Sequence, residues 1–166
     1  MPNALSTFLI LTIDGVSYGM MLFLISVGLT ITLGVMRVVN LTHSAFAMIG
    51  GFIALWLMQT TGMHFFAALP LSVVATMAIS LAMERTLYQW VYKSNPLGQL
   101  LMTIGMTFVI TALVKNLAGP QIQTITLPPS LIGQLSFGDM SISTYRLFVL
   151  GTSVAVAAAL WLCLEY

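Results

Sequence analysis

Long hydrophobic stretches separated by short polar breaks dominate the chain. Charged residues occupy only nine positions, and the stretches between them carry none over 15–36, 38–83, 94–114, 116–138 and 147–164. Runs of about 18 or more apolar residues are typical of helices that span a membrane. The pattern therefore predicts an all-α, polytopic membrane protein.

The breaks in this pattern divide the chain into five predicted transmembrane helices. Asp14-Gly15 is expected to separate a short interfacial helix at 4–13 from the first span, because a carboxylate is costly inside a membrane and glycine weakens a helix. Gly62 predicts the turn before the third span, with Pro70 near the start of that span. Asn95-Pro96 has the capping side chain and the proline that commonly open a helix. The predicted spans are 15–36, 45–60, 67–83, 97–114 and 147–164.

The stretch 116–146 contains three prolines and several Ser, Thr and Gln residues, so it is predicted to form an extramembrane loop. We expect the whole of 1–166 to form a single transmembrane domain. Tyr88, Trp90 and Tyr92 fit a segment at the membrane surface, where amphipathic rings settle among the lipid headgroups.

The basic residues near the span ends predict an orientation. The side that holds the first-to-second and third-to-fourth connections carries three of them, and the opposite side carries two. By the positive-inside rule this difference favours an N-terminus outside the cell and a cytoplasmic C-terminus. The three are Arg37, Arg85 and Lys93, and the two are Lys115 and Arg146.

Composition excludes several classes of protein. Of 166 residues, 59% are hydrophobic and 5% charged, with a mean hydropathy of +1.03, whereas soluble domains carry about a quarter charged residues. A net charge of +1 without a basic patch excludes a nucleic-acid binder. The lone Cys163 excludes a disulfide framework or a cysteine-rich metal site. No phosphate-binding or nucleophile motif is present, so we expect no catalytic residue, no metal site and no cofactor bound by this chain.

Small residues recur at helical spacing in three places. Gly15 and Gly19 form a GxxxG pair, Ala47 and Gly51 have the same spacing, and one stripe holds Ser72, Thr76 and Ser80. Such stripes let helix backbones approach closely. Packing within one bundle is the ordinary interpretation, and a homodimer seam or a pore lining are the alternatives.

A cluster of polar residues stands between the first two spans. About eight residues separate the two apolar runs, and they include Arg37, Asn40, Thr42, His43 and Ser44. Non-helical backbone at membrane depth occurs only where it is buried in protein or lines a watery cavity. Two interpretations remain open: these side chains line a path for a polar solute, or they cap the second span and satisfy a buried carbonyl.

The same segment carries a family resemblance. The run Val39-Asn40-Leu41-Thr42-His43-Ser44-Ala45-Phe46-Ala47, which continues to Gly50-Gly51, resembles the N-[FL]-[AT]-H-G signature of permease subunits in branched-chain amino-acid ABC importers of the LivH type. The segment from Gly15 to Thr30 is similar to the first helix of that family, and Glu84-Arg85 onward to Gly105 is similar to its third-to-fourth helix region. Ser44 stands where the family usually has Gly.

The resemblance implies a fold, a function and partners. The chain would be a multi-pass subunit of the bacterial inner membrane that translocates branched-chain or related hydrophobic amino acids. It would pair with a second, identical or different, permease subunit, and with cytoplasmic subunits that use ATP and Mg²⁺. A periplasmic binding protein would deliver the solute, with urea and short amides as alternative solutes. Asn40, Thr42, His43 and Ser44 would line the path, and Glu84-Arg85 would lie on the cytoplasmic face, where contact with a partner subunit is an alternative role.

Family permeases are considerably longer, so we expect this chain to be the N-terminal part of one, without the segment that docks on the ATPase. The alternative from another class is a structural or assembly membrane protein without transport activity of its own. A neighbouring gene for an ATPase would favour transport, and copurification without an ATPase would favour the structural role.

Overall fold

The computed structural model describes residues 4–36, 40–91, 94–119, 121, 123–137 and 140–165. Within these residues five helices are long and apolar enough to cross a membrane, which confirms the predicted all-α, polytopic fold. These candidate spans are Thr7–Gly34, His43–Thr61, Phe65–Tyr88, Pro96–Ala118 and Thr144–Cys163.

The chain divides into two compact units, which are described separately. The first unit comprises 1–27 and 127–166, and the second comprises 28–126. The boundary falls inside the first long helix, α1 (Ala4–Ile31). The expectation of a single transmembrane domain stays a prediction.

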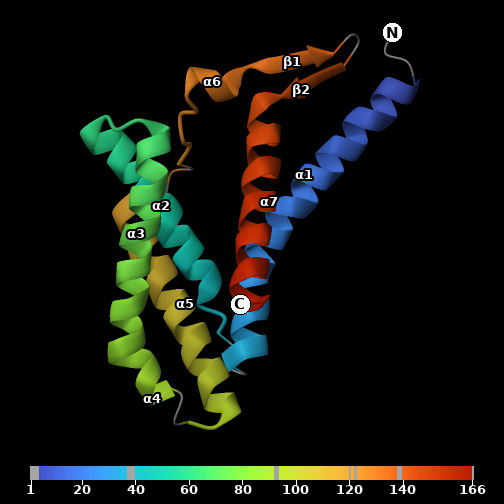
Figure 1. Cartoon of the computed structure of the whole chain (residues 1–166). Helices are drawn as coiled ribbons and strands as arrows, with labels where there is room; N and C mark the ends of the chain where they lie inside the picture. The colour runs from blue at the N-terminus through green and yellow to red at the C-terminus, as the bar shows by residue number, and fades with distance from the viewer. Residues whose placement is uncertain are drawn as a thin grey trace. The chain divides into compact units, whose positions relative to one another are not determined.

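In the first unit, the helix α7 (Thr144–Glu165) follows directly from a β-hairpin, as Figure 1 shows. A single helical turn, α6 (Pro129–Ile132), leads into antiparallel strands β1 (Gln134–Phe137) and β2 (Met140–Ser143), with Gln134 paired to Ser143. The first residue of α7 is tied to this hairpin, because the N–H and hydroxyl of Thr144 both donate to the carbonyl of Gly133, at 3.0 and 2.9 Å. The predicted loop at 116–146 therefore contains ordered structure.

The predicted break at Asp14-Gly15 is wrong, because α1 runs without interruption from Ala4 to Ile31. Asp14 accepts a hydrogen bond and ion pair from the guanidinium of Arg146 on α7. This partner offsets the cost of a carboxylate among apolar side chains, which the sequence alone left uncompensated. The N-terminal residues from Ala4 onward are consequently part of the same helix as the first span, and not a separate interfacial helix.

In the second unit, α2 (His43–Thr61) packs against both α3 (Phe65–Met83) and α5 (Pro96–Ala118), and the three run side by side in Figure 1. A turn at the predicted position joins α2 to α3, since Gly62 ends α2 with a left-handed φ of 66°. Such a φ favours glycine because other residues have a Cβ that crowds the backbone.

Two further helix boundaries bear on the sequence predictions. Asn95 caps α5 as predicted, and its side-chain oxygen accepts from the N–H of Gly98 at 2.8 Å. Pro70, by contrast, lies inside α3 and not at its opening, because the helix already begins at Phe65. The remaining elements are the π-helical turns η1 (Thr32–Met36) and η2 (Glu84–Tyr88) and the short α4 (Gln89–Val91).

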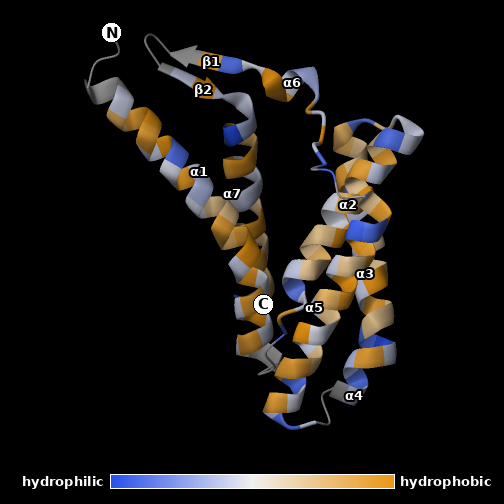
Figure 2. Cartoon of the chain, turned by 180° about the vertical axis from the view of Figure 1, so that it is seen from behind, coloured by the Kyte–Doolittle hydropathy of each residue, from blue (hydrophilic) through white to orange (hydrophobic). Residues whose placement is uncertain are grey.

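Large apolar side chains cover the outside of the helices. Phe108 and Leu117 on α5 are each 71% exposed, and hydrophobic colour predominates along α1, α3, α5 and α7 in Figure 2. A hydrocarbon environment stabilises such a surface, whereas water does not. The chain is a multi-pass membrane protein.

Candidate functional site

The polar segment before α2 forms a buried junction with two other helices. The side-chain oxygen of Asn40 accepts from the N–H of Thr42 at 3.0 Å and from the hydroxyl of Tyr88, at the end of η2, at 3.4 Å. The hydroxyl of Thr42 crosses to α5 and donates to the backbone carbonyl of Thr103 at 3.2 Å. Thr42, Tyr88 and Thr103 are at most 1% exposed.

In this junction, Asn40 and Thr42 stabilise the start of α2. Thr42 occupies the N-cap position, but its hydroxyl makes no capping bond and instead joins α2 to α5. Asn40 supplies the partner for the Thr42 N–H. Their predicted role as path-lining residues stays a prediction.

Tyr88 differs from its prediction. The sequence placed its ring at the membrane surface, but the side chain is 1% exposed and lies inside the bundle. Trp90, two residues later, is 71% exposed and fits a surface position, and Tyr92 lies outside the described residues. The sequence does not reveal which ring of the aromatic cluster turns into the bundle. That orientation depends on a tertiary contact, the one between Tyr88 and Asn40.

His43, the first residue of α2, is half-buried and comes close to the end of α1. A Cβ placed on Gly28 would overlap Cε1 and Nε2 of the imidazole and lie 3.0 Å from Cδ2. Gly28 belongs to the same compact unit as His43. The imidazole therefore occupies a notch that exists because residue 28 has no side chain.

A groove of about 550 Å³ runs between α2 and α3, with His43 among its lining residues. Small residues make room for it on α2, and hydroxyl-bearing residues line its α3 side. The α2 residues include Ala47, Gly50, Gly51 and Ala54, and the α3 residues include Ser72, Thr76 and Ser80. The predicted stripes at Ala47/Gly51 and Ser72/Thr76/Ser80 are thus brought together along one groove. Its volume lies within the range of small-molecule sites, about 300–1,000 Å³.

The hydroxyl groups in this groove keep acceptor capacity for a solute. Ser72 donates to the carbonyl of Leu69 at 2.7 Å, and Thr76 donates to that of Ser72 at 2.7 Å. Because each hydroxyl oxygen has two lone pairs besides its one proton, it can still accept from an ammonium or amide group. His43 adds an imidazole that offers one donor and one acceptor when neutral.

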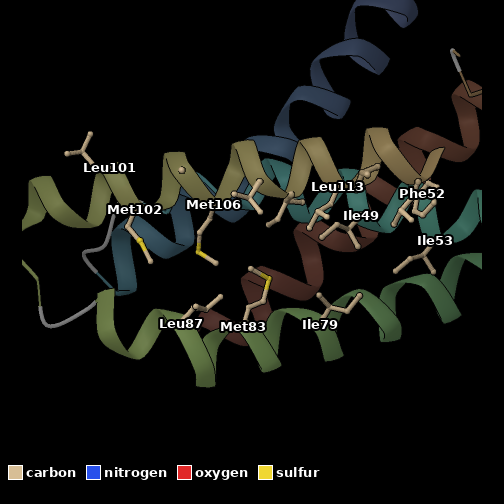
Figure 3. Close-up of a pocket in the computed structure, with 15 residues that line it drawn as sticks. Ile49, Phe52, Ile53, Ile79, Met83, Leu87, Leu101, Met102, Met106 and Leu113 are labelled. Carbon is tan, nitrogen blue, oxygen red and sulfur yellow. The ribbon is translucent and has the colours of Figure 1, made fainter. Parts of the chain in front are cut away.

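A second, larger groove lacks such groups. Its volume is about 720 Å³, and apolar side chains from α2, α3, η2 and α5 line it. Met106 on α5 and Met83 at the end of α3 point toward one another across it in Figure 3. An amino acid that entered this groove would lose its hydration without replacement, a cost of several kcal/mol or more for a charged group. The α2–α3 groove is the better candidate for a polar solute.

The other predicted site residues lie apart from this groove. Ser44 is exposed, and its hydroxyl donates to the carbonyl of Leu41 at 3.2 Å. Glu84 and Arg85 lie in η2, with Arg85 exposed and its carbonyl accepting from the Gln89 side chain. Arg37, also named in the polar break, lies outside the described residues.

Gly15 and Gly19 lie on the part of α1 that belongs to the first unit. Beyond the chain neighbours and the backbone of the same helical turn, no atom of the described residues lies within 4 Å of a Cβ placed on either glycine. Their predicted role in helix packing therefore stays a prediction. In the described parts of the chain, no three His, Cys, Asp or Glu side chains gather closely enough to hold a metal ion.

Comparison with known proteins identifies the family. Residues 11–166 match the family described as "Branched-chain amino acid transport system / permease component". The chain belongs to this permease family. The match covers the whole described structure except the first residues of α1, and so includes both compact units and the α2–α3 groove.

One curated relative of this permease chain is the "High-affinity branched-chain amino acid transport system permease protein BraD" of Pseudomonas aeruginosa. The two sequences are 27% identical over 139 residues, which is 79% of this chain and 45% of the relative. The chain thus spans about half the length of the relative. No solved structure shows a significant match to it.

Three residues that contact the predicted site residues were not identified as such from the sequence. Gly28, Tyr88 and Thr103 meet the polar segment only through tertiary contacts. Gly28 and Thr103 carried no local signal, since both lie inside long apolar runs. Tyr88 carried a weak signal, because the hydroxyl of a buried tyrosine needs a polar partner, and Asn40 provides it.

Proposed function

We propose that this permease chain forms part of the translocation path of an ABC importer for branched-chain or related hydrophobic amino acids. The observation that carries the proposal is the α2–α3 groove, in which the His43 imidazole and three hydroxyl groups stand among otherwise apolar lining residues. The polar groups suit an amino acid's charged ends, and the lining of Phe46, Leu69 and Val73 suits its aliphatic side chain.

The proposed partners are those that the family resemblance implies. ATP-binding subunits are among them because this sequence contains no phosphate-binding motif. Transport would be driven by ATP hydrolysis in separate cytoplasmic subunits, which use Mg²⁺, and this chain would have no enzyme activity itself. A second permease subunit would complete the path, and a periplasmic binding protein would deliver the solute. The complex would lie in the bacterial inner membrane, with the N-terminus of this chain outside.

Uptake of labelled leucine tests the proposal. The gene product that contains this sequence is expressed with its ATP-binding and solute-binding subunits in cells that lack their own leucine importers. ATP-dependent uptake is expected, and His43→Ala is expected to lower uptake per assembled complex several-fold. His64→Ala is the matched control, because His64 is exposed at the turn before α3, and its uptake should stay near that of the wild type.

Two results would contradict the proposal. A complex that assembles normally but takes up no branched-chain amino acid, urea or short amide would favour the structural role. Equal uptake per complex in His43→Ala and wild type, with only less complex present, would make His43 a packing residue.

A further inference from the structure

Gly28 lies so close to His43 that any side chain at position 28 would force the imidazole to shift. A Cβ at position 28 would overlap the far edge of the imidazole. Beyond its chain neighbours and the backbone of its own helical turn, Gly34 on the π-helical turn that follows α1 has no described atom within 4 Å of an added Cβ. The close approach is thus particular to Gly28 and is not shared by every glycine of this segment.

The backbone beneath the His43 ring is held from two sides. The preceding residue, Thr42, is fully buried; its N–H donates to Asn40 at 3.0 Å and its hydroxyl to the carbonyl of Thr103 at 3.2 Å. A side chain added at position 28 therefore cannot be accommodated easily by a shift of the chain at residue 43. The imidazole, whose own two torsions are free to change, is what would move.

We propose that Gly28 is a positioning residue for solute transport, because its missing Cβ seats the His43 imidazole beside the α2–α3 groove. This inference rests on the proposed function of that groove. Gly28 does not line the groove itself, so it acts through His43 alone. A larger residue at position 28 would turn the ring and change the polar face that the groove presents to a solute.

A general packing role for Gly28 makes a different prediction. If Gly28 only lets helices approach, its replacement weakens the complex whether or not an imidazole is present. If Gly28 acts through His43, removal of the imidazole frees the space, and a Cβ at position 28 then costs nothing. Residues that act through one another show such non-additive effects, whereas independent residues add.

A double-mutant cycle on leucine uptake tests the proposal. Gly28→Ala, His43→Ala, the double variant and the control Gly34→Ala are compared with wild type in the full transporter, with uptake divided by the amount of assembled complex. Gly28→Ala and His43→Ala should each reduce uptake several-fold. The double variant should match His43→Ala, and Gly34→Ala should match the wild type. A double variant reduced by the product of the two single effects would overturn the proposal, as would normal uptake per complex in Gly28→Ala.

The ring position can also be measured without transport. The rate at which diethyl pyrocarbonate modifies His43, followed by mass spectrometry on the peptide that contains this residue, reports on its imidazole within the assembled transporter. Gly28→Ala should change this rate several-fold, and Gly34→Ala should leave it unchanged. An unchanged rate in Gly28→Ala refutes the positioning role even if the transporter is active. If the wild type shows no uptake but Gly28→Ala changes the rate of His43 modification, the proposed function is refuted. The conclusion that Gly28 positions the imidazole then still stands.

Discussion

Replacement of Asn40 by Ala probes the junction that holds the start of α2. The substitution removes the one side-chain oxygen that accepts from both the Thr42 N–H and the Tyr88 hydroxyl. It leaves α2, α3 and α5 chemically unchanged. The expected result is a destabilised but folded transporter in which α2 is less firmly fixed.

The size of the effect follows from the two hydrogen bonds. A typical intramolecular bond contributes about 0.5–1.5 kcal/mol net, so the loss of two predicts about 1–3 kcal/mol. The Tyr88 bond is long at 3.4 Å, whereas hydroxyl bonds usually measure about 2.7–2.8 Å, so the Thr42 bond should account for the larger share. The buried Thr42 N–H then has no side-chain acceptor from position 40.

Unfolding of the purified complex in mixed micelles with increasing amounts of denaturing detergent measures the loss. Ser44→Ala is the matched control, because Ser44 is exposed and its hydroxyl donates to the carbonyl of Leu41, three residues earlier. We expect a loss of less than about 0.5 kcal/mol there. Tyr88→Phe combined with Asn40→Ala should be less destabilising than the two single effects added together, since the pair shares one bond. Stability equal to wild type in Asn40→Ala would refute the junction as a structural element.

Two further predictions concern charge and orientation. Asp14→Ala and Arg146→Ala should each lower the amount of complex in the membrane, since each leaves one charge without its partner within a candidate span. The double variant should recover part of the loss, and less complex in the double variant than in either single variant would contradict the pairing. Single cysteines at Ser94 and Gln123, in a Cys163→Ala background, should react with an impermeant reagent from opposite sides of intact cells, Gln123 from outside. Labelling of both from outside would contradict the proposed orientation.

The helices were readable from the sequence because each depends on local signals. Gly62 ends α2 with the left-handed backbone that glycine favours, and Asn95 caps α5 with a bond to Gly98. Three charge-free apolar runs predicted one span each, and the longest, 38–83, predicted two spans divided near Gly62. The break expected at Asp14 failed for a non-local reason, since its partner Arg146 lies 132 residues away.

The candidate site was readable only in part. The polar residues Asn40, Thr42 and His43 stood out because hydrophobic runs flank them. Their partners did not, because Thr103 offers a backbone carbonyl, which every residue has, and Gly28 offers an absent side chain. Which face of α3 turns its hydroxyl groups toward α2 likewise depends on helix packing, which periodicity alone does not determine.

Reaction of a cysteine in the groove tests the central claim most directly. Ala47 on α2 lines the α2–α3 groove, and Gly105 on α5 lines the larger apolar groove. Each is replaced by Cys in a transporter whose native cysteines, Cys163 among them, have been replaced by Ala. A small thiol-reactive reagent should block leucine uptake through Ala47→Cys, and saturating leucine with the binding protein should slow that block, whereas Gly105→Cys should keep its uptake. Uptake that survives complete modification of Ala47→Cys, or that is lost equally in both variants, would contradict a path along α2 and α3.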